Sequence, residues 1–106
     1  MKVFELRDVM EQLDRTGQAY FEFLRVAAIS TGLYALPAGG ADPQQPHRED
    51  EVYHVVQGRA VLRVEDEDHP VEAGTIAFVA AQADHRFHTI TEDLVALVYF
   101  APAESE

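Results

Sequence analysis

Two histidines and one glutamate are the residues whose types and spacing best fit a chemical role. His47 and Glu51 lie close together in the stretch that ends at Gly58. Alternate side chains of an extended chain point to one face, so His47, Glu51 and Tyr53 share a side unless a bend near residues 48–50 breaks the count. An ionisable group that faces an apolar interior is costly unless it is paired or bound to a metal. The spacing therefore indicates a metal site.

A second segment supplies the complement, because His85 shares one strand face with Phe87. Two histidines and one carboxylate with open coordination positions form the triad typical of non-haem Fe(II), and such a site also accepts Mn, Ni, Co or Zn. The other histidines do not fit this pattern. His54 and His88 have the opposite parity and are expected to face outward, and His69 lies in an expected hairpin.

The elements that position these residues begin with a helix. Apolar residues repeat at helical spacing from Leu6 to Leu13, and Gly17 comes next as a plausible C-terminal stop. We expect residues 1–17 to be an N-terminal segment whose short amphipathic helix covers an edge or an end of the remaining structure.

From residue 18 the pattern changes to short strands that recur about every 8–12 residues, with Gly, Pro or Asp between them. The expected strands are Tyr20–Arg25, Ser30–Leu36, Val52–Val56, Ala60–Val64, His69–Val71, Ile76–Val79, His85–Thr89 and Leu94–Phe100. This spacing favours an all-β sandwich or barrel over alternating strands and helices. Residues 18–106 are therefore expected to form one barrel domain, which ends in a short low-complexity tail after Phe100.

Composition restricts the partners. The chain has 8 Lys+Arg against 19 Asp+Glu, a net charge of −11. This charge argues against nucleic acid, whose phosphates are bound by Lys and Arg, and against anionic membranes. The absence of cysteine excludes disulfides, thiolate metal sites and a Cys nucleophile. No apolar run is long enough for a membrane span and the N-terminus does not fit a signal peptide, so a cytoplasmic protein is expected.

The residues around His47 resemble the first sequence motif of the cupin superfamily, in particular of its small single-domain members. That motif runs His-x-His, three or four residues, Glu, six residues and Gly. His47 matches the second histidine, Glu51 the glutamate and Gly58 the glycine, while Gln45 stands at the first histidine.

The residues around His85 resemble the second cupin motif, which runs Gly, five residues, Pro-x-Gly, two residues, His, three residues and Asn. Gly74 matches the first glycine and His85 the histidine. Ala80, Gln82 and Thr89 stand where Pro, Gly and Asn are usual. These departures alter a turn and leave the ligand position intact.

The resemblance covers Gly32 through Phe100 and implies a double-stranded β-helix (jelly-roll) barrel with a divalent metal inside. The implied metal ligands are Gln45, His47, Glu51 and His85. The side chains expected beside the metal, as a substrate pocket, are Tyr34, Tyr53, Phe87 and Tyr99. Gln45 either binds through its amide oxygen or leaves the metal to the two-histidine, one-carboxylate triad. The alternative is a metal-free barrel in which Gln45 hydrogen-bonds Glu51.

Cupins that resemble this chain include dioxygenases, isomerases, decarboxylases and cyclases. The expected function is therefore that of a metalloenzyme that acts on a small molecule, either an oxidoreductase of dioxygenase type, an isomerase or a cyclase. The expected ion is Fe, Mn, Ni, Co or Zn. The sequence assigns no catalytic residues. The alternative is a non-catalytic module that binds or senses a small molecule. A homodimer is expected, because the aromatic strand around Tyr20 and Phe21 leaves an edge that pairing would cover.

Overall fold

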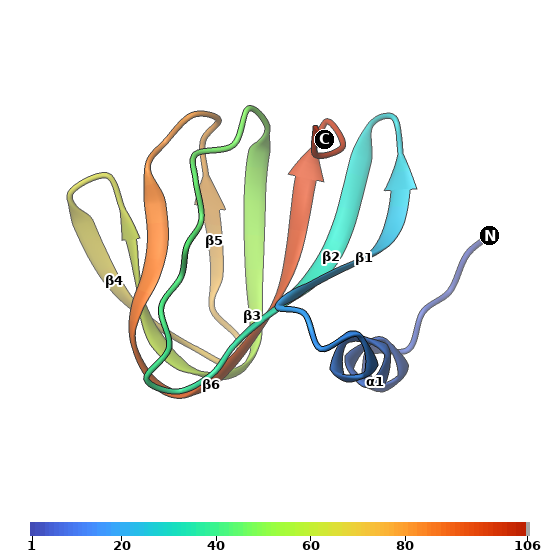
Figure 1. The fold of residues 1–106 in the computed structure, drawn as a ribbon. Helices are drawn as coiled ribbons and strands as arrows, with labels where there is room; N and C mark the ends of the chain where they lie inside the picture. Colours follow the sequence, from blue (N-terminus) through green and yellow to red (C-terminus); the bar gives the residue numbers. More distant parts are fainter. Residues whose placement is uncertain (106) are drawn as a thin grey trace.

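One curled antiparallel sheet with a helix outside it makes up the computed structural model, which describes residues 1–105 (Figure 1). The elements are α1 (Leu6–Thr16), β1 (Tyr20–Val26), β2 (Ile29–Leu36), β3 (Asp50–Val64), β4 (Glu67–Glu72), β5 (Ile76–Val79) and β6 (His85–Ala101). The strand order is β1-β2-β6-β3-β4, and β5 pairs with β3. The expected all-β barrel with a short N-terminal helix is confirmed.

The strands β3 and β6 are longer than the sequence predicts, because each runs through a position read as a break. Val52–Val56 and Ala60–Val64 both belong to β3, and its register against β6 shifts around Gly58. Gly58 has φ of 95°, and a Cβ there would meet the Asp93 carbonyl oxygen and the Leu94 Cα. Glycine therefore lets β3 bend around the barrel without ending.

The sheet buries its inner face and part of its outer face. The inner face forms the main core of the barrel, and its buried residues are Tyr34, Leu36, Tyr53, Val55, Ala60, Leu62, Val71, Val79, Phe87, Ile90, Leu94, Ala96, Val98 and Phe100. The helix α1 lies on the outer side of the sheet (Figure 1). There Val9 and Leu13 of α1 pack against Leu33 and Val95. The helix therefore covers the outside of the sheet over β1 and β2 and leaves the interior free for a site.

The helix α1 ends where the sequence predicts. Gly17 adopts a left-handed conformation with φ of 68°, and its N–H is directed to the Asp14 carbonyl oxygen. No helix in the described part of the chain has the length and apolarity that a membrane crossing requires.

Candidate metal centre

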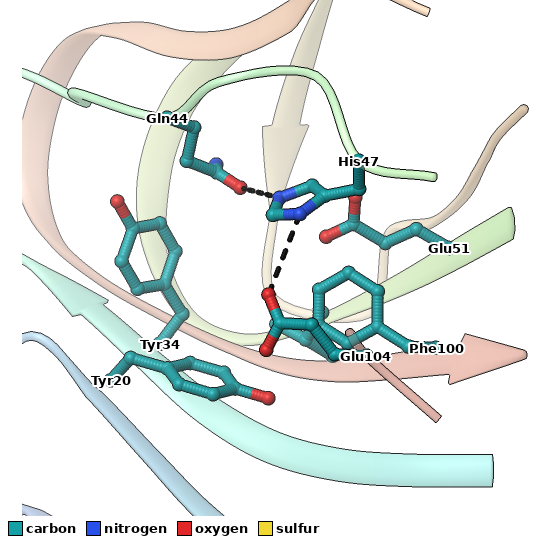
Figure 2. A pocket seen from close by; sticks show the side chains of 8 residues that line it. Tyr20, Tyr34, Gln44, His47, Glu51, Phe100 and Glu104 are labelled. Carbon is teal, nitrogen blue, oxygen red and sulfur yellow. Dashed lines mark hydrogen bonds and ion pairs between the residues drawn. The ribbon is translucent and has the colours of Figure 1, made fainter. Parts of the chain in front are cut away.

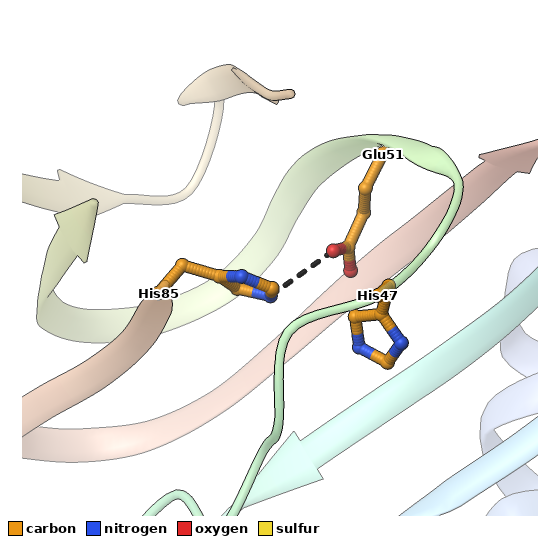
Figure 3. Close-up of side chains that lie close together, drawn as sticks. All are labelled: His47, Glu51 and His85. Atoms are coloured by element: carbon orange, nitrogen blue, oxygen red, sulfur yellow. Dashed lines mark ion pairs between the residues drawn. The ribbon is translucent and has the colours of Figure 1, made fainter. Parts of the chain in front are cut away.

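The structure brings His47, Glu51 and His85 together inside the barrel. Glu51 lies near the start of β3, His85 begins β6, and His47 lies in the irregular segment before β3. One potential ligand atom from each residue lies within 4.8 Å of the other two. The side chains of Glu51 and His85 are each 1% exposed, and that of His47 is 21% exposed. Figure 3 shows the ion pair between His85 and Glu51 with the His47 ring beside it.

The polar atoms of Glu51 and His85 fit a metal ion. Nε2 of His85 lies 3.1 Å from Oε1 of Glu51, yet this nitrogen and both Glu51 oxygens are buried without a hydrogen-bond partner. Nδ1 of His85 donates to the Ala83 carbonyl oxygen at 3.0 Å, so the Nε2 lone pair is left to face the carboxylate. Imidazole and carboxylate lone pairs that converge in this way form a donor set that a divalent cation satisfies.

The same contacts act on the protonation of His85 when no cation is bound. Burial lowers the pKa of His85, but the Glu51 carboxylate and the Ala83 carbonyl raise it by more. The pKa of His85 therefore stands above its ordinary value. A proton and a metal ion compete for the same position between His85 and Glu51.

His47 has an oxygen beside each of its ring nitrogens. Nε2 lies 3.2 Å from Oε1 of Gln44, and Nδ1 lies 3.4 Å from Oε2 of Glu104 (Figure 2). The His47 ring packs edge-on against Phe100, with 4.9 Å between centroids, and its centroid lies 5.5 Å from that of His85. These contacts place the ring beside Glu51 and His85.

Gln45 does not reach this group, so its predicted inward orientation is wrong. The side chain of Gln45 is exposed, whereas Gln44 is partly buried and lines the cavity beside His47. The prediction counted alternate residues as in a strand, but the chain before Asp50 has no regular structure and contains Pro46. The alternation of side chains shifts by one residue there, and Gln44 lies where Gln45 was expected.

Asp42 fixes the orientation of the Gln44 amide. Asp42 is buried, and its Oδ2 accepts from Nε2 of Gln44 at 2.7 Å and from the Phe87 N–H at 2.9 Å. Its Oδ1 accepts from the Tyr34 hydroxyl at 2.6 Å. Because Gln44 donates its NH2 group to Asp42, its amide oxygen faces the other way and accepts from the Tyr53 hydroxyl at 3.0 Å. A neutral oxygen donor therefore lies beside the triad.

A cavity of about 180 Å³ opens next to these residues (Figure 2). Its lining residues are Tyr20, Tyr34, Gln44, His47, Glu51, Val98, Phe100 and Glu104. The Tyr20 hydroxyl is buried without a partner, and burial with nearby carboxylates raises its pKa far above the ordinary value. Tyr20 therefore keeps its proton and offers the cavity a hydrogen-bond donor.

The predicted pocket residues separate into three groups. Tyr34 lines the cavity. Tyr53 and Phe87 are buried deeper and pack edge to face at 4.8 Å between centroids, with Tyr53 also 6.1 Å from the His85 ring. Tyr99 lies on the outer face in a groove with Val9 of α1, so its prediction as a pocket residue is wrong.

The position of Tyr99 results from an irregularity in β6. His85 and Phe87 are buried before Thr89, whose φ is 49°, and the buried positions after it are mostly even-numbered, from Ile90 to Phe100. A residue with positive φ interrupts the alternation of side chains, so the inward positions change from odd-numbered to mostly even-numbered along β6 and Tyr99 faces outward. Phe100 points into the cavity instead.

Five cavity residues were not predicted as site residues, and one of them, Val98, belongs to the expected strand Leu94–Phe100. Gln44 and Phe100 are one position from predicted ones, and the interruptions at Pro46 and Thr89 explain the displacement. Tyr20 belongs to the aromatic first strand, where the alternation of side chains could have assigned it to the inner face. Glu104 lies beyond the last strand and has no local pattern around it.

The remaining histidines lie outside the triad. Nε2 of His88 lies 2.9 Å from Oδ1 of Asp68, and this contact lowers the pKa of Asp68. His69 is exposed, and His54 is partly buried at a β3 position that alternates with the inward Tyr53 and Val55.

The fold and this site define the class of the protein. Residues 32–100, about two-thirds of the chain, match the family model described as a cupin domain, so the chain belongs to the cupin family. It is 47% identical over 105 residues to the uncharacterized protein SCO3923 of Streptomyces coelicolor, a match that covers 99% of this chain and 100% of that protein.

Solved structures with the same fold include TT1209 from Thermus thermophilus, at 26% identity and a TM-score of 0.71, covering 97% of this chain and 99% of that one. The DMSP lyase DddQ from Ruegeria pomeroyi DSS-3 has 20% identity and a TM-score of 0.74, over 78% of this chain and 46% of the lyase. The chain thus matches about half the length of that lyase, and this likeness concerns the fold alone.

Proposed function

We propose that this chain is a metal-dependent enzyme that acts on a small molecule, with His47, Glu51 and His85 as ligands of a divalent ion. The observation that carries the proposal is the convergence of the Glu51 oxygens and His85 Nε2, all buried without a hydrogen-bond partner. Each such group costs about 1–3 kcal/mol when it is left unsatisfied in the interior. A bound cation removes that cost. The Gln44 amide oxygen, which faces His47, is the proposed fourth donor.

A divalent ion at this place would supply Lewis-acid polarisation of a substrate oxygen or, if it is redox-active, electron transfer. The chain's own residues bind and orient the substrate. The Tyr20 hydroxyl donates a hydrogen bond into the cavity, and Val98 and Phe100 form apolar walls. An apolar cavity of about 150 Å³ accepts benzene. The 180 Å³ here therefore suits a substrate about the size of one small ring.

The proposal also concerns the class of reaction and the identity of the metal. Two histidines and a carboxylate favour Fe(II) and a dioxygenase, while an isomerase or cyclase would use a Mn, Ni, Co or Zn ion as a Lewis acid. Oxygen consumption over a panel of diketones, phenols, thiols and keto acids distinguishes these. Uptake of O₂ supports the dioxygenase, and substrate turnover without O₂ uptake supports the others. Tight binding without turnover would instead favour a non-catalytic binding module.

Metal content tests the proposal directly. Protein purified without chelator and without nickel affinity should contain a divalent metal close to one per chain by elemental analysis. His47→Ala should abolish uptake, and His54→Ala, which removes a histidine of β3 outside the triad, should retain it. A wild-type protein that contains no metal and takes up none on addition would refute the proposal. Equal effects of the two variants would refute the ligand assignment.

A homodimer is part of the same proposal. The strand β1 pairs only with β2 among the described strands, and exposed apolar side chains lie near this edge at Phe4, Leu6 and Val26. Pairing of two copies would cover both the edge and these side chains. Analytical ultracentrifugation should give twice the chain mass of 11.8 kDa, and a monomer at all concentrations tested would contradict the dimer. The cytoplasmic location stays a prediction.

A further inference from the structure

The segment after β6 folds back over the cavity and is held there by its backbone. The Ala103 N–H bonds to the Ala27 carbonyl oxygen at 3.3 Å. The Glu104 N–H bonds to the Ser30 hydroxyl oxygen at 2.8 Å, and the Glu104 carbonyl accepts from Arg25 at 2.7 Å. These three contacts, none of which uses the Glu104 side chain, fix the position of residue 104.

The side chain of Glu104 is thereby free to point into the cavity. It lines the cavity, is 26% exposed, and places Oε2 at 3.4 Å from Nδ1 of His47 (Figure 2). The pKa of Glu104 is raised, because burial and the nearby carboxylates outweigh the lowering effect of His47. The carboxylate is thus a cavity group in contact with a residue of the proposed metal centre.

A histidine that binds a metal through one ring nitrogen carries a proton on the other, and a nearby carboxylate fixes this tautomer and the ring orientation. The Gln44 amide oxygen can only accept, so without a metal Nε2 of His47 carries the ring proton; when Nε2 binds a metal, the proton passes to Nδ1, beside which the Glu104 carboxylate lies at 3.4 Å. In His85 the corresponding acceptor at Nδ1 is the Ala83 carbonyl oxygen. Both histidines therefore have an oxygen beside Nδ1, a carboxylate oxygen at 3.4 Å in His47 and a hydrogen-bonded carbonyl oxygen at 3.0 Å in His85.

We infer that Glu104 is a positioning residue of the metal centre, which holds the His47 ring with its Nε2 toward the ion. The inference rests on the proposed function, because it requires that a metal binds. It adds that the C-terminal segment, which lies outside the matched family region, completes the site.

Co(II) binding to wild type, Glu104→Gln and Glu104→Ala tests this role. Loss of such an outer partner typically lowers metal affinity about 10–100-fold. We expect a fall in that range for Glu104→Ala and a smaller one for Glu104→Gln, which keeps an acceptor oxygen. Glu72→Ala is the matched control, because Glu72 is an exposed carboxylate paired with Arg59 and does not line the cavity. It should bind Co(II) like wild type.

Proton NMR of the Co(II) form gives a readout that a purely structural role would not move. Wild type should show two exchangeable, paramagnetically shifted imidazole N–H signals, from His47 and His85. In Glu104→Ala the His47 signal should exchange with solvent and disappear, while the His85 signal, protected by Ala83, should remain as an internal control.

The outcomes separate the two proposals. Wild type that binds no Co(II) overturns both the metal centre and the role of Glu104. Wild type that binds, together with Glu104→Ala of the same affinity and with both N–H signals, overturns the role of Glu104 alone. Loss of both N–H signals in Glu104→Ala would show general disruption and would also overturn it.

Discussion

Removal of Asp42 should destabilise the barrel and loosen the metal centre at once. Asp42→Ala leaves two buried donors without an acceptor, the Tyr34 hydroxyl and the Phe87 N–H. Each buried unsatisfied donor costs about 1–3 kcal/mol, so the two together cost about 2–6 kcal/mol. The two Gln44 donors are only partly buried and can turn to water, so they add little. The expected loss is a large part of the roughly 5–15 kcal/mol that is typical of a domain.

Urea unfolding of the metal-free protein measures this loss. Tyr34→Phe is the matched comparison, because it removes one donor while Asp42 keeps its other partners, and we expect it to cost about 0.5–1.5 kcal/mol. In the double variant the phenyl ring leaves no orphan hydroxyl, so the double loss should be smaller than the sum of the single losses. Co(II) affinity should also fall in Asp42→Ala, because the Gln44 amide is released. A loss below about 1 kcal/mol for Asp42→Ala would refute the reasoning.

Two further predictions concern the frame around the site. Gly58→Ala should cost about 3 kcal/mol or more in chemical unfolding, because the added Cβ would meet backbone atoms of Asp93 and Leu94. Gly74→Ala is the control, because Gly74 has φ of 99° but open space around it, and it should cost less. Equal losses in the two variants would contradict the steric account. Because the folded-state pKa of His85 is raised, its stabilising effect is complete below about pH 6.5 and is lost as pH rises through that raised value. In urea unfolding, metal-free protein should therefore be more stable at about pH 6 than at about pH 8.5. Glu51→Gln should flatten this pH dependence. A pH dependence that is unchanged in Glu51→Gln would show that the His85–Glu51 pair does not cause it.

The sequence predicts the inner face of β3 correctly because this strand is regular there. Glu51, Tyr53 and Val55 are all buried, and residues 51–54 pair without interruption with β5 and β6. Under these conditions alternation alone assigns each side chain to a face. The resemblance of residues 74–85 to the second cupin motif then adds His85 as a candidate ligand from a distant strand.

Counting fails at Gln45, where the chain is irregular, and the resemblance alone, without a count of alternate residues, misplaces Tyr99. Gln45 and Tyr99 are each one position from the residue that points inward, Gln44 or Phe100. Pro46 lies in a segment without regular structure, and Thr89 has a positive φ. Proline is a readable warning in the sequence, whereas threonine at positive φ is not, because the residue type does not favour that conformation. The first error could have been avoided and the second could not.

Glu104 shows a different limit, because no periodicity links it to His47. The link is the register of β6, which pairs Phe100 with Ser30 on one side and Ala101 with Asp50 on the other. The chain that continues past Ala101 must therefore lie between the start of β2 and the segment before β3, and His47 is in that segment. Once the strand order β2-β6-β3 is known, an acidic residue just after the last strand becomes a candidate partner of the first-motif histidine. Topology, which local sequence patterns do not encode, is what brings the tail into the site.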